Sequence, residues 1–225
     1  MHFDHLSLSY GERTILRDIS LSIDPGEFIF LVGSSGSGKT SFIRSIIWAI
    51  APNKGDITTN DGKKLHSLSS NELLTYRRSI WVIFQDFKLL RKKTVKENVA
   101  FAMEVCGYSD EVIEKRIPEV LSQVGLLQKK DKFVETLSGG ELQRTAIARA
   151  LIHHPSIIIG DEPTGNLDPK NAEEIILLLE KLNKEWKTII IATHDDRLVN
   201  TMKRRVITFK DGRLVSDENP WTFTI

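Results

Sequence analysis

The 225 residues carry 31 lysines and arginines against 30 aspartates and glutamates, and this net charge of +1 gives no overall attraction to nucleic acid. No stretch approaches the roughly 18 apolar residues that a membrane span requires, and Met1 begins no signal-peptide pattern. The single cysteine, Cys106, excludes a disulfide within the chain, and we expect it to be a buried small apolar residue. A cytoplasmic protein of one domain with a substantial core is therefore predicted.

The first part of the chain alternates apolar and polar residues, as the strands of a half-exposed sheet do. This alternation covers residues 6–10 and again residues 19–23. An antiparallel N-terminal sheet is therefore predicted. The turn sequence at 24–26 then leads into a continuous apolar run at 28–32, which suits a strand buried on both faces.

A glycine-rich loop follows that run. Residues 33–40 fit the pattern G-x-x-x-x-G-K-[ST], in which backbone N–H groups surround a polyphosphate, the lysine approaches its β and γ oxygens, and a hydroxyl binds Mg²⁺. Apolar residues at helical spacing come next, so the anion would lie at a helix N-terminus, which favours negative charge. A chance loop would match this pattern in about 1% of random chains of this length. The predicted phosphate-binding residues are Gly33, Ser34, Ser35, Gly36, Ser37, Gly38, Lys39, Thr40 and Ser41.

The middle of the chain is predicted to be helical. Thr94 with Glu97 forms a capping box that opens a helix ending near Cys106, and Ser109 or Asp110 opens a second helix. Together with a helix after residue 138, these would form a helical lobe inserted between two strands of the core. The predicted division is a core lobe, residues 1–85 and 154–225, and a helical lobe, about 86–153.

The last part returns to alternating strands and helices. The apolar run at 157–159 leads to Asp161 and Glu162, and a pair of acids at the carboxyl end of a parallel strand would lie beside the phosphate loop. Asp168 before Pro169 is a good N-cap for a helix at about 171–186. The strand at 188–193 and a terminal hairpin complete an α/β P-loop fold with a parallel core sheet, an antiparallel N-terminal sheet and an inserted helical part.

The order of these motifs resembles that of the nucleotide-binding subunits of ABC (ATP-binding cassette) ATPases. The segment LSGGE at 137–141, followed by LQR, is similar to the signature of that family. Ser138 can cap the following helix, while Gly139 and Gly140 let backbone N–H groups approach a phosphate closely. In isolation the segment would also fit a glycine turn before an amphipathic helix, but the order of the motifs favours the signature.

The resemblance implies a role for each remaining motif residue. Asp161 would hold the Mg²⁺ shell, Glu162 would polarise the attacking water, and His194 would contact the γ-phosphate. Tyr10 would stack on adenine, although it could also simply pack at the end of a strand. The implied catalytic residues are Glu162, His194, Gln85 and Lys39, the implied metal-binding residues are Thr40, Gln85 and Asp161, and the nucleotide contacts outside the phosphate loop are Tyr10, Ser138, Gly139, Gly140, Glu141 and Asp168.

The resemblance also implies partners. With one phosphate loop and one signature per chain, the family arrangement needs two copies head-to-tail, each Mg-ATP lying between the Lys39 loop of one copy and the Ser138 helix of the other. The segments at 84–90 and 94–99 are most similar to ATPases of bacterial cell division, which act through an integral membrane protein on enzymes that cut the cell wall. The protein would then lie on the inner face of the membrane and bind no nucleic acid. An ATPase of a lipoprotein-releasing or macrolide exporter, which shares the string at 163–168, is an alternative, and so is a nucleotide-gated scaffold with little turnover.

Apolar and basic residues are mixed just after Gln85. Phe87, Leu89 and Leu90 lie among five basic side chains within residues 88–96, a composition that suits a groove for an apolar helix of a membrane protein. The alternative is that the apolar residues pack within the helical lobe while the lysines are solvated.

Overall fold

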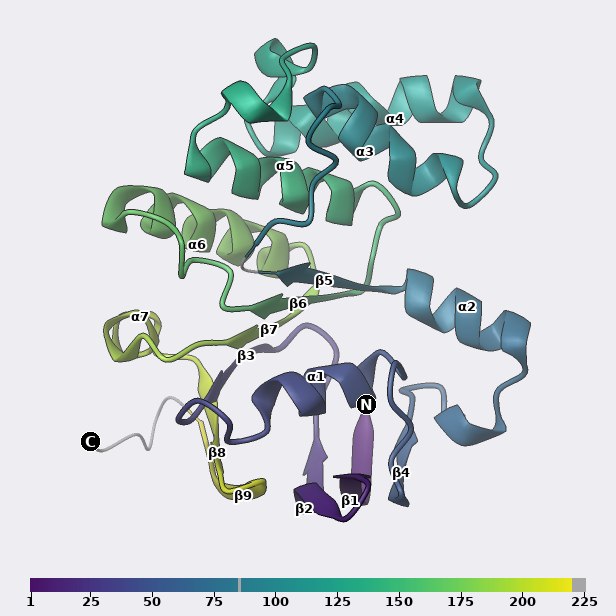
Figure 1. The fold of residues 1–225 in the computed structure, drawn as a ribbon, viewed down its shortest axis with the longest axis vertical. Helices are drawn as coiled ribbons and strands as arrows, with labels where there is room; N and C mark the ends of the chain where they lie inside the picture. The colour runs from purple at the N-terminus through teal and green to yellow at the C-terminus, as the bar shows by residue number, and fades with distance from the viewer. Residues whose placement is uncertain (85, 220–225) are drawn as a thin grey trace.

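The computed structural model describes residues 1–84 and 86–219 (Figure 1). Gln85, a predicted catalytic and metal-binding residue, lies outside the described residues. The strands are β1 (His2–Tyr10), β2 (Arg13–Ser22), β3 (Phe28–Val32), β4 (Lys54–Thr58), β5 (Ile80–Phe84), β6 (Ile157–Asp161), β7 (Thr188–Ala192), β8 (Arg205–Lys210) and β9 (Arg213–Glu218). The α-helices are α1 (Lys39–Ile46), α2 (Ser70–Arg78), α3 (Val95–Glu104), α4 (Asp110–Gln123), α5 (Gly139–Leu151), α6 (Pro169–Lys184) and α7 (Asp196–Met202), with short 3₁₀ turns at Leu65–Ser67, Leu127–Lys129 and Val134–Thr136.

Two sheets organise these elements. The larger has six strands in the order β5-β6-β7-β3-β8-β9, of which all but the β8–β9 pair run parallel to their neighbours. The smaller is the antiparallel sheet β2-β1-β4. The predicted fold class, a parallel α/β core with an N-terminal antiparallel sheet and added helices, is confirmed.

The central strands are apolar throughout because both of their faces are covered. In β3, Phe28 and Phe30 join the core that lies toward the helices α3 to α6, whereas Ile29 and Leu31 join the core shared with α1 and the small sheet. This alternation follows from the two-residue period of a strand. In Figure 1 α1 lies between the two sheets, and Phe42 on this helix contacts Phe3 with ring centroids 4.9 Å apart. The phosphate-loop helix is thereby fixed from both sides.

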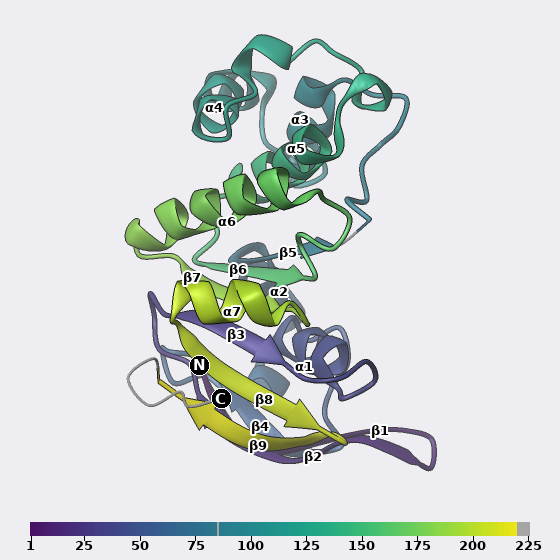
Figure 2. The same cartoon turned by 90° about the vertical axis from the view of Figure 1, so that its left-hand side faces the viewer.

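The helices α3, α4 and α5 gather beyond α6, at the end of the molecule away from β1 and β2 (Figures 1 and 2). Side-chain caps fix where two of them start. Thr94 and Glu97 form a reciprocal capping box before α3, and Ser138 and Glu141 form another before α5. Each cap satisfies N–H groups that the first turn of a helix leaves without partners.

Some local predictions differ from the structure. The helix predicted from residue 171 begins earlier, at Pro169, because Asp168 caps it and proline is well suited to the first helical turn. Cys106 was expected to be buried but is only half-buried. It follows the end of α3, where the chain turns at the surface, and its Sγ lies 4.0 Å from Nε2 of His153.

Arg205 links the terminal hairpin to the start of β3. Its guanidinium donates hydrogen bonds to both carboxylate oxygens of Asp217, each at 2.7 Å, and to Glu27 at 2.8 Å. We predict that Arg205→Met lowers the free energy of unfolding by about 1–3 kcal/mol, since two carboxylates lose a charged donor. Urea denaturation measures this change. The exposed Arg213 of β9 provides the control, and an equal loss in Arg213→Met would show that the effect comes from charge alone.

Candidate active site

The carboxyl ends of four parallel strands meet in one row. Phe84 of β5 is paired with Asp161 of β6, Asp161 with Ala192 of β7, and Ala192 with Leu31 of β3. The loops that follow these strands therefore leave the same edge of the sheet, although up to about 160 residues separate them in the sequence. This edge is the usual position of ligand sites in open α/β sheets.

The glycines of the phosphate loop allow a backbone path that other residues would obstruct. Gly33 has φ 143° and Gly38 has φ 111°, both in the region that favours glycine. A Cβ atom on Gly33 would overlap the carbonyl oxygen of Phe209, and one on Gly38 would lie 2.8 Å from the side chain of Leu16. The loop thus packs closely on β8 and β2 while its own backbone leads into α1.

Lys39 is held over this loop. The side chain is almost buried, and its Nζ donates hydrogen bonds to the carbonyl oxygens of Gly33 at 2.6 Å and Ser34 at 3.2 Å. The buried hydroxyl of Ser37 has no hydrogen-bond partner within residues 1–84 and 86–219. The ammonium group and the hydroxyl lie beside a helix N-terminus, and both can donate hydrogen bonds to the oxygens of a polyphosphate.

Two acidic side chains face the loop from the end of β6. Oγ1 of Thr40 donates a hydrogen bond to Oδ2 of Asp161 at 3.1 Å, and burial raises the pKa of Asp161 above its ordinary value. Nδ1 of His194, which follows β7, lies 2.7 Å from one carboxylate oxygen of Glu162 and 2.6 Å from the other. Glu162 has φ 54°, an uncommon conformation for a residue other than glycine that often occurs at functional sites.

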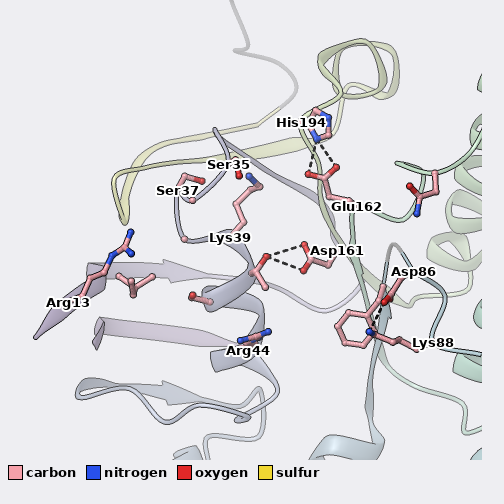
Figure 3. A pocket seen from close by; sticks show the side chains of 17 residues that line it. Arg13, Ser35, Ser37, Lys39, Arg44, Asp86, Lys88, Asp161, Glu162 and His194 are labelled. Carbon is pink, nitrogen blue, oxygen red and sulfur yellow. Dashed lines mark hydrogen bonds and ion pairs between the residues drawn. The ribbon is translucent and has the colours of Figure 1, made fainter. Parts of the chain in front are cut away.

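These residues line one cleft of about 1020 Å³ (Figure 3). It contains the phosphate-loop residues from 35 to 41, and Asp161, Glu162 and His194 lie on its opposite wall. Sequence reasoning missed several further lining residues. Arg44 was detectable because it lies one helical turn after Thr40, whereas the others depend on tertiary structure. The additional lining residues are Arg13, Ile15, Arg44, Phe84, Asp86 and Lys88, together with Asn166.

Other predicted site residues do not line the cleft. Tyr10 is exposed at the end of β1, and its strand partner Arg13 lines the cleft instead. Gly33 and Ser34 contribute backbone carbonyls to Lys39. The signature residues Ser138, Gly139, Gly140 and Glu141 lie at the start of α5, and Asp168 caps α6, where Asn171 donates to it from its backbone and its side chain.

The signature segment lies against the start of α6. Gly140 is buried, and a Cβ atom there would overlap the side chain of Asn171. Ser138 and Gly139, in contrast, are exposed. Of the signature residues predicted to contact a nucleotide, Ser138 and Gly139 therefore lie on a surface that another molecule can reach.

The donor set fits Mg²⁺ carried by a nucleotide. Within residues 1–84 and 86–219, no group of three histidine, cysteine or acidic side chains could hold a metal alone. Thr40 and Asp161 supply one hydroxyl and one carboxylate, both oxygen ligands of the kind that Mg²⁺ prefers, and phosphate oxygens usually complete such a shell.

The sequence matches the family model described as ABC transporter over residues 16–165. The chain belongs to the ABC transporter family. It is 49% identical over 206 residues to the cell division ATP-binding protein FtsE of Streptococcus pneumoniae, which covers 92% of this chain and 89% of that protein. FtsE of Mycobacterium tuberculosis is 45% identical over 219 residues, covering 96% and 94% of the two chains.

The fold of this ABC chain is similar to solved ATP-binding cassettes. MJ0796, in a dimeric post-hydrolysis state bound to ADP and Pi, has a TM-score of 0.85 and 34% identity and covers 99% of both chains. The chain is therefore an ATPase and the ATP-binding subunit of an ABC complex. Among the described residues, no helix is both long and apolar enough to cross a membrane.

Lys39 provides a direct test of the nucleotide site. Replacement of Lys39 by alanine removes the charged donor, and we expect ATP affinity to fall by about 10- to 100-fold. Calorimetric titration with ATP measures the affinity. Lys210→Ala, which removes the same charge from an exposed position at the end of β8, should retain it. Near-normal affinity in Lys39→Ala would contradict the assignment of this loop.

Proposed function

We propose that this protein is the ATP-hydrolysing subunit of a membrane complex that acts in bacterial cell division, with an FtsX-like integral membrane protein as partner. The role in cell division rests on relatives named FtsE at 45–50% identity over nearly the whole chain. The chemistry rests on the cleft, where the phosphate loop faces an acid and a histidine. The protein would act on the inner face of the membrane through its partner.

The roles of the cleft residues follow from their positions. Lys39 would bind the β and γ phosphates, while Thr40 and Asp161 would hold Mg²⁺, which neutralises charge on the phosphates when bound. Glu162 would orient the attacking water and accept its proton. His194 would fix the direction of the Glu162 carboxylate through the hydrogen bond of 2.7 Å, and its largely exposed ring leaves it able to reach a γ-phosphate.

One observation supports a composite site made by two copies. The signature residues 138–141 are absent from the lining of the cleft that contains Lys39 and Glu162. If the signature contacts ATP, it must therefore contact the ATP of another subunit. Head-to-tail pairing of two copies would place each nucleotide between two surfaces, so that ATP acts as a contact and its cleavage loosens the dimer.

Glu162→Gln separates binding from chemistry. The amide keeps the size of the side chain but cannot accept a proton, so we expect turnover to fall by about 10²- to 10⁴-fold while Mg-ATP binding persists. The variant should accumulate as an ATP-held dimer, which size-exclusion chromatography with light scattering detects. Glu111→Gln, at an exposed position on α4, is the matched control. Turnover at the wild-type rate, or a monomer in the presence of ATP and the membrane partner, would exclude this role.

A surface on the helical part is suited to the membrane partner. Phe101, Val105 and Tyr108, here called the α3 patch, are 41, 63 and 44% exposed. Phe101 and Val105 lie one helical turn apart and share a face. Leu89 and Leu90, predicted from the sequence to receive the partner, are half-buried, and the backbone of Leu90 is bonded to Asn98. The α3 patch is therefore the more accessible apolar surface near the cleft-lining segment after β5.

Val105→Asp tests this patch. A carboxylate at the centre of an apolar contact must be desolvated, so we expect the membrane partner to be lost from co-purification. Val215→Asp is the control because this valine is similarly exposed, at 53%, but lies on β9 at the other end of the molecule (Figure 1). ATP binding should be retained by both variants. Equal recovery of the partner with both would refute a docking role for the α3 patch.

A further inference from the structure

Arg149 on α5 holds the backbone of the segment that follows β5. Its Nη1 donates a hydrogen bond to the carbonyl oxygen of Lys88 at 2.6 Å, and its Nη2 donates to that of Phe87 at 2.9 Å. The planar guanidinium thus binds two consecutive carbonyls as a fork, a geometry that lysine cannot reproduce. Among the described residues, none accepts a hydrogen bond from its buried Nε.

The segment that Arg149 binds has an unusual conformation. Phe87 has φ 58° and Lys88 has φ 49°, so two successive residues other than glycine lie in the left-handed region. The backbone N–H of Lys88 donates to the carbonyl of Asp86 at 2.6 Å and closes a three-residue turn. Such a backbone persists only where surrounding groups hold it. Arg149 supplies that restraint from another element.

The next part of this loop is held from α3. Asn98 is fully buried, donates hydrogen bonds from Nδ2 to the carbonyls of Leu90 at 3.1 Å and Thr94 at 2.9 Å, and accepts one from the N–H of Leu90 at 2.7 Å. Asn98 therefore anchors the far end of the loop to the helical part. The strained turn between this anchor and the end of β5 depends on Arg149.

The same turn borders the nucleotide cleft. Asp86 and Lys88 form an ion pair of 2.5 Å and both line the cleft, as Figure 3 shows. Arg149 lies near the C-terminal end of α5, and the signature residues lie at the N-terminal end of the same helix. In Figure 1 the chain after β5 passes α5 on its way to α3. A rigid helix thus connects the signature to one wall of the cleft in the same subunit.

We infer that Arg149 is a positioning residue that transmits movement of the signature helix α5 to the Phe87–Lys88 turn at the nucleotide cleft of its own subunit. This inference rests on the proposed function, in which the start of α5 contacts the ATP of a second copy. Binding of that ATP shifts α5, and the two hydrogen bonds of Arg149 carry the shift to the turn. Each subunit then adjusts its own cleft to the nucleotide held by its partner.

The test compares Arg149→Met, Arg149→Lys and the wild-type full chain. Loss of the two hydrogen bonds of Arg149 should lower kcat for ATP hydrolysis by about tenfold while KM changes little. The reason is that the Phe87–Lys88 turn acts after ATP has bound and the two copies have assembled. Cooperativity in ATP should be lost. Arg149→Lys replaces the two-pronged guanidinium by a single ammonium group. Its kcat and cooperativity should lie between those of the wild type and of Arg149→Met. Arg205→Met, which removes another partly buried arginine, controls for general destabilisation and should keep wild-type kcat and cooperativity.

Hydrogen exchange gives a readout independent of turnover. In the wild type, a non-hydrolysable ATP analogue should slow amide exchange in the peptide covering 86–94 under dimer-forming conditions. In Arg149→Met this peptide should exchange rapidly with or without the analogue. Lys88→Gly should partly restore kcat in the Arg149→Met background, since glycine adopts the left-handed turn without the restraint. Because glycine does not rebuild the hydrogen bonds to α5, cooperativity in ATP and the analogue-dependent protection of 86–94 should stay lost in this double variant. If Arg149 merely held the turn, the double variant would recover both.

The outcomes separate this inference from the proposed function. If the wild type neither binds nor hydrolyses ATP, the proposed function fails and the inference fails with it. If the wild type is an active, cooperative ATPase and Arg149→Met and Arg149→Lys match it in kcat, cooperativity and exchange of 86–94, only the inference is overturned. If Arg149→Met does not fold, Arg149→Lys and the double variant with Lys88→Gly decide by the same measurements.

Discussion

The parallel register of β5, β6, β7 and β3 is the constraint on which the site depends. It aligns Phe84, Asp161, Ala192 and Leu31 in one row, so the loops after these strands share one edge of the sheet. The strands hold this register because their side chains are buried on both faces, where a slip of one residue would exchange every side chain between two packed cores. The distances of the cleft are therefore set by the core and not by the loops.

That rigid frame tolerates local strain where the site needs it. Glu162, Phe87 and Lys88 all have positive φ, and each such residue costs of the order of 1–3 kcal/mol unless its surroundings compensate. The backbone N–H of Glu162 donates to the carbonyl of Ala192 at 2.9 Å, whereas the carbonyls of the other two residues accept hydrogen bonds from Arg149 on α5. The first restraint belongs to the sheet and is fixed. The second belongs to a helix and can move with it.

The sequence predicts the parts of the site that are local. The phosphate loop, the capping box at Ser138 and Glu141, and the acids after β6 are each encoded within about ten residues, so pattern and spacing suffice. Arg13 and Arg149 could not be found in this way. Arg13 reaches the cleft because the β1–β2 register pairs it with Tyr10, and Arg149 meets Phe87 across 62 residues of sequence. Cys106 was misjudged because apolar neighbours along the chain do not reveal that the helix ends there.

In the free subunit, several polar groups of the cleft are hydrogen-bonded to other groups of the same chain. This pairing explains why ATP can join two subunits. Lys39 is bonded to loop carbonyls, Thr40 to Asp161, and His194 to Glu162, so these groups of the cleft already have partners within the chain. A nucleotide must replace these bonds, and the gain from one surface is correspondingly small. The exposed start of α5 supplies further donors that the cleft of its own chain does not use. Tight capture of ATP then depends on both surfaces, and loss of the γ-phosphate removes the group that joins them.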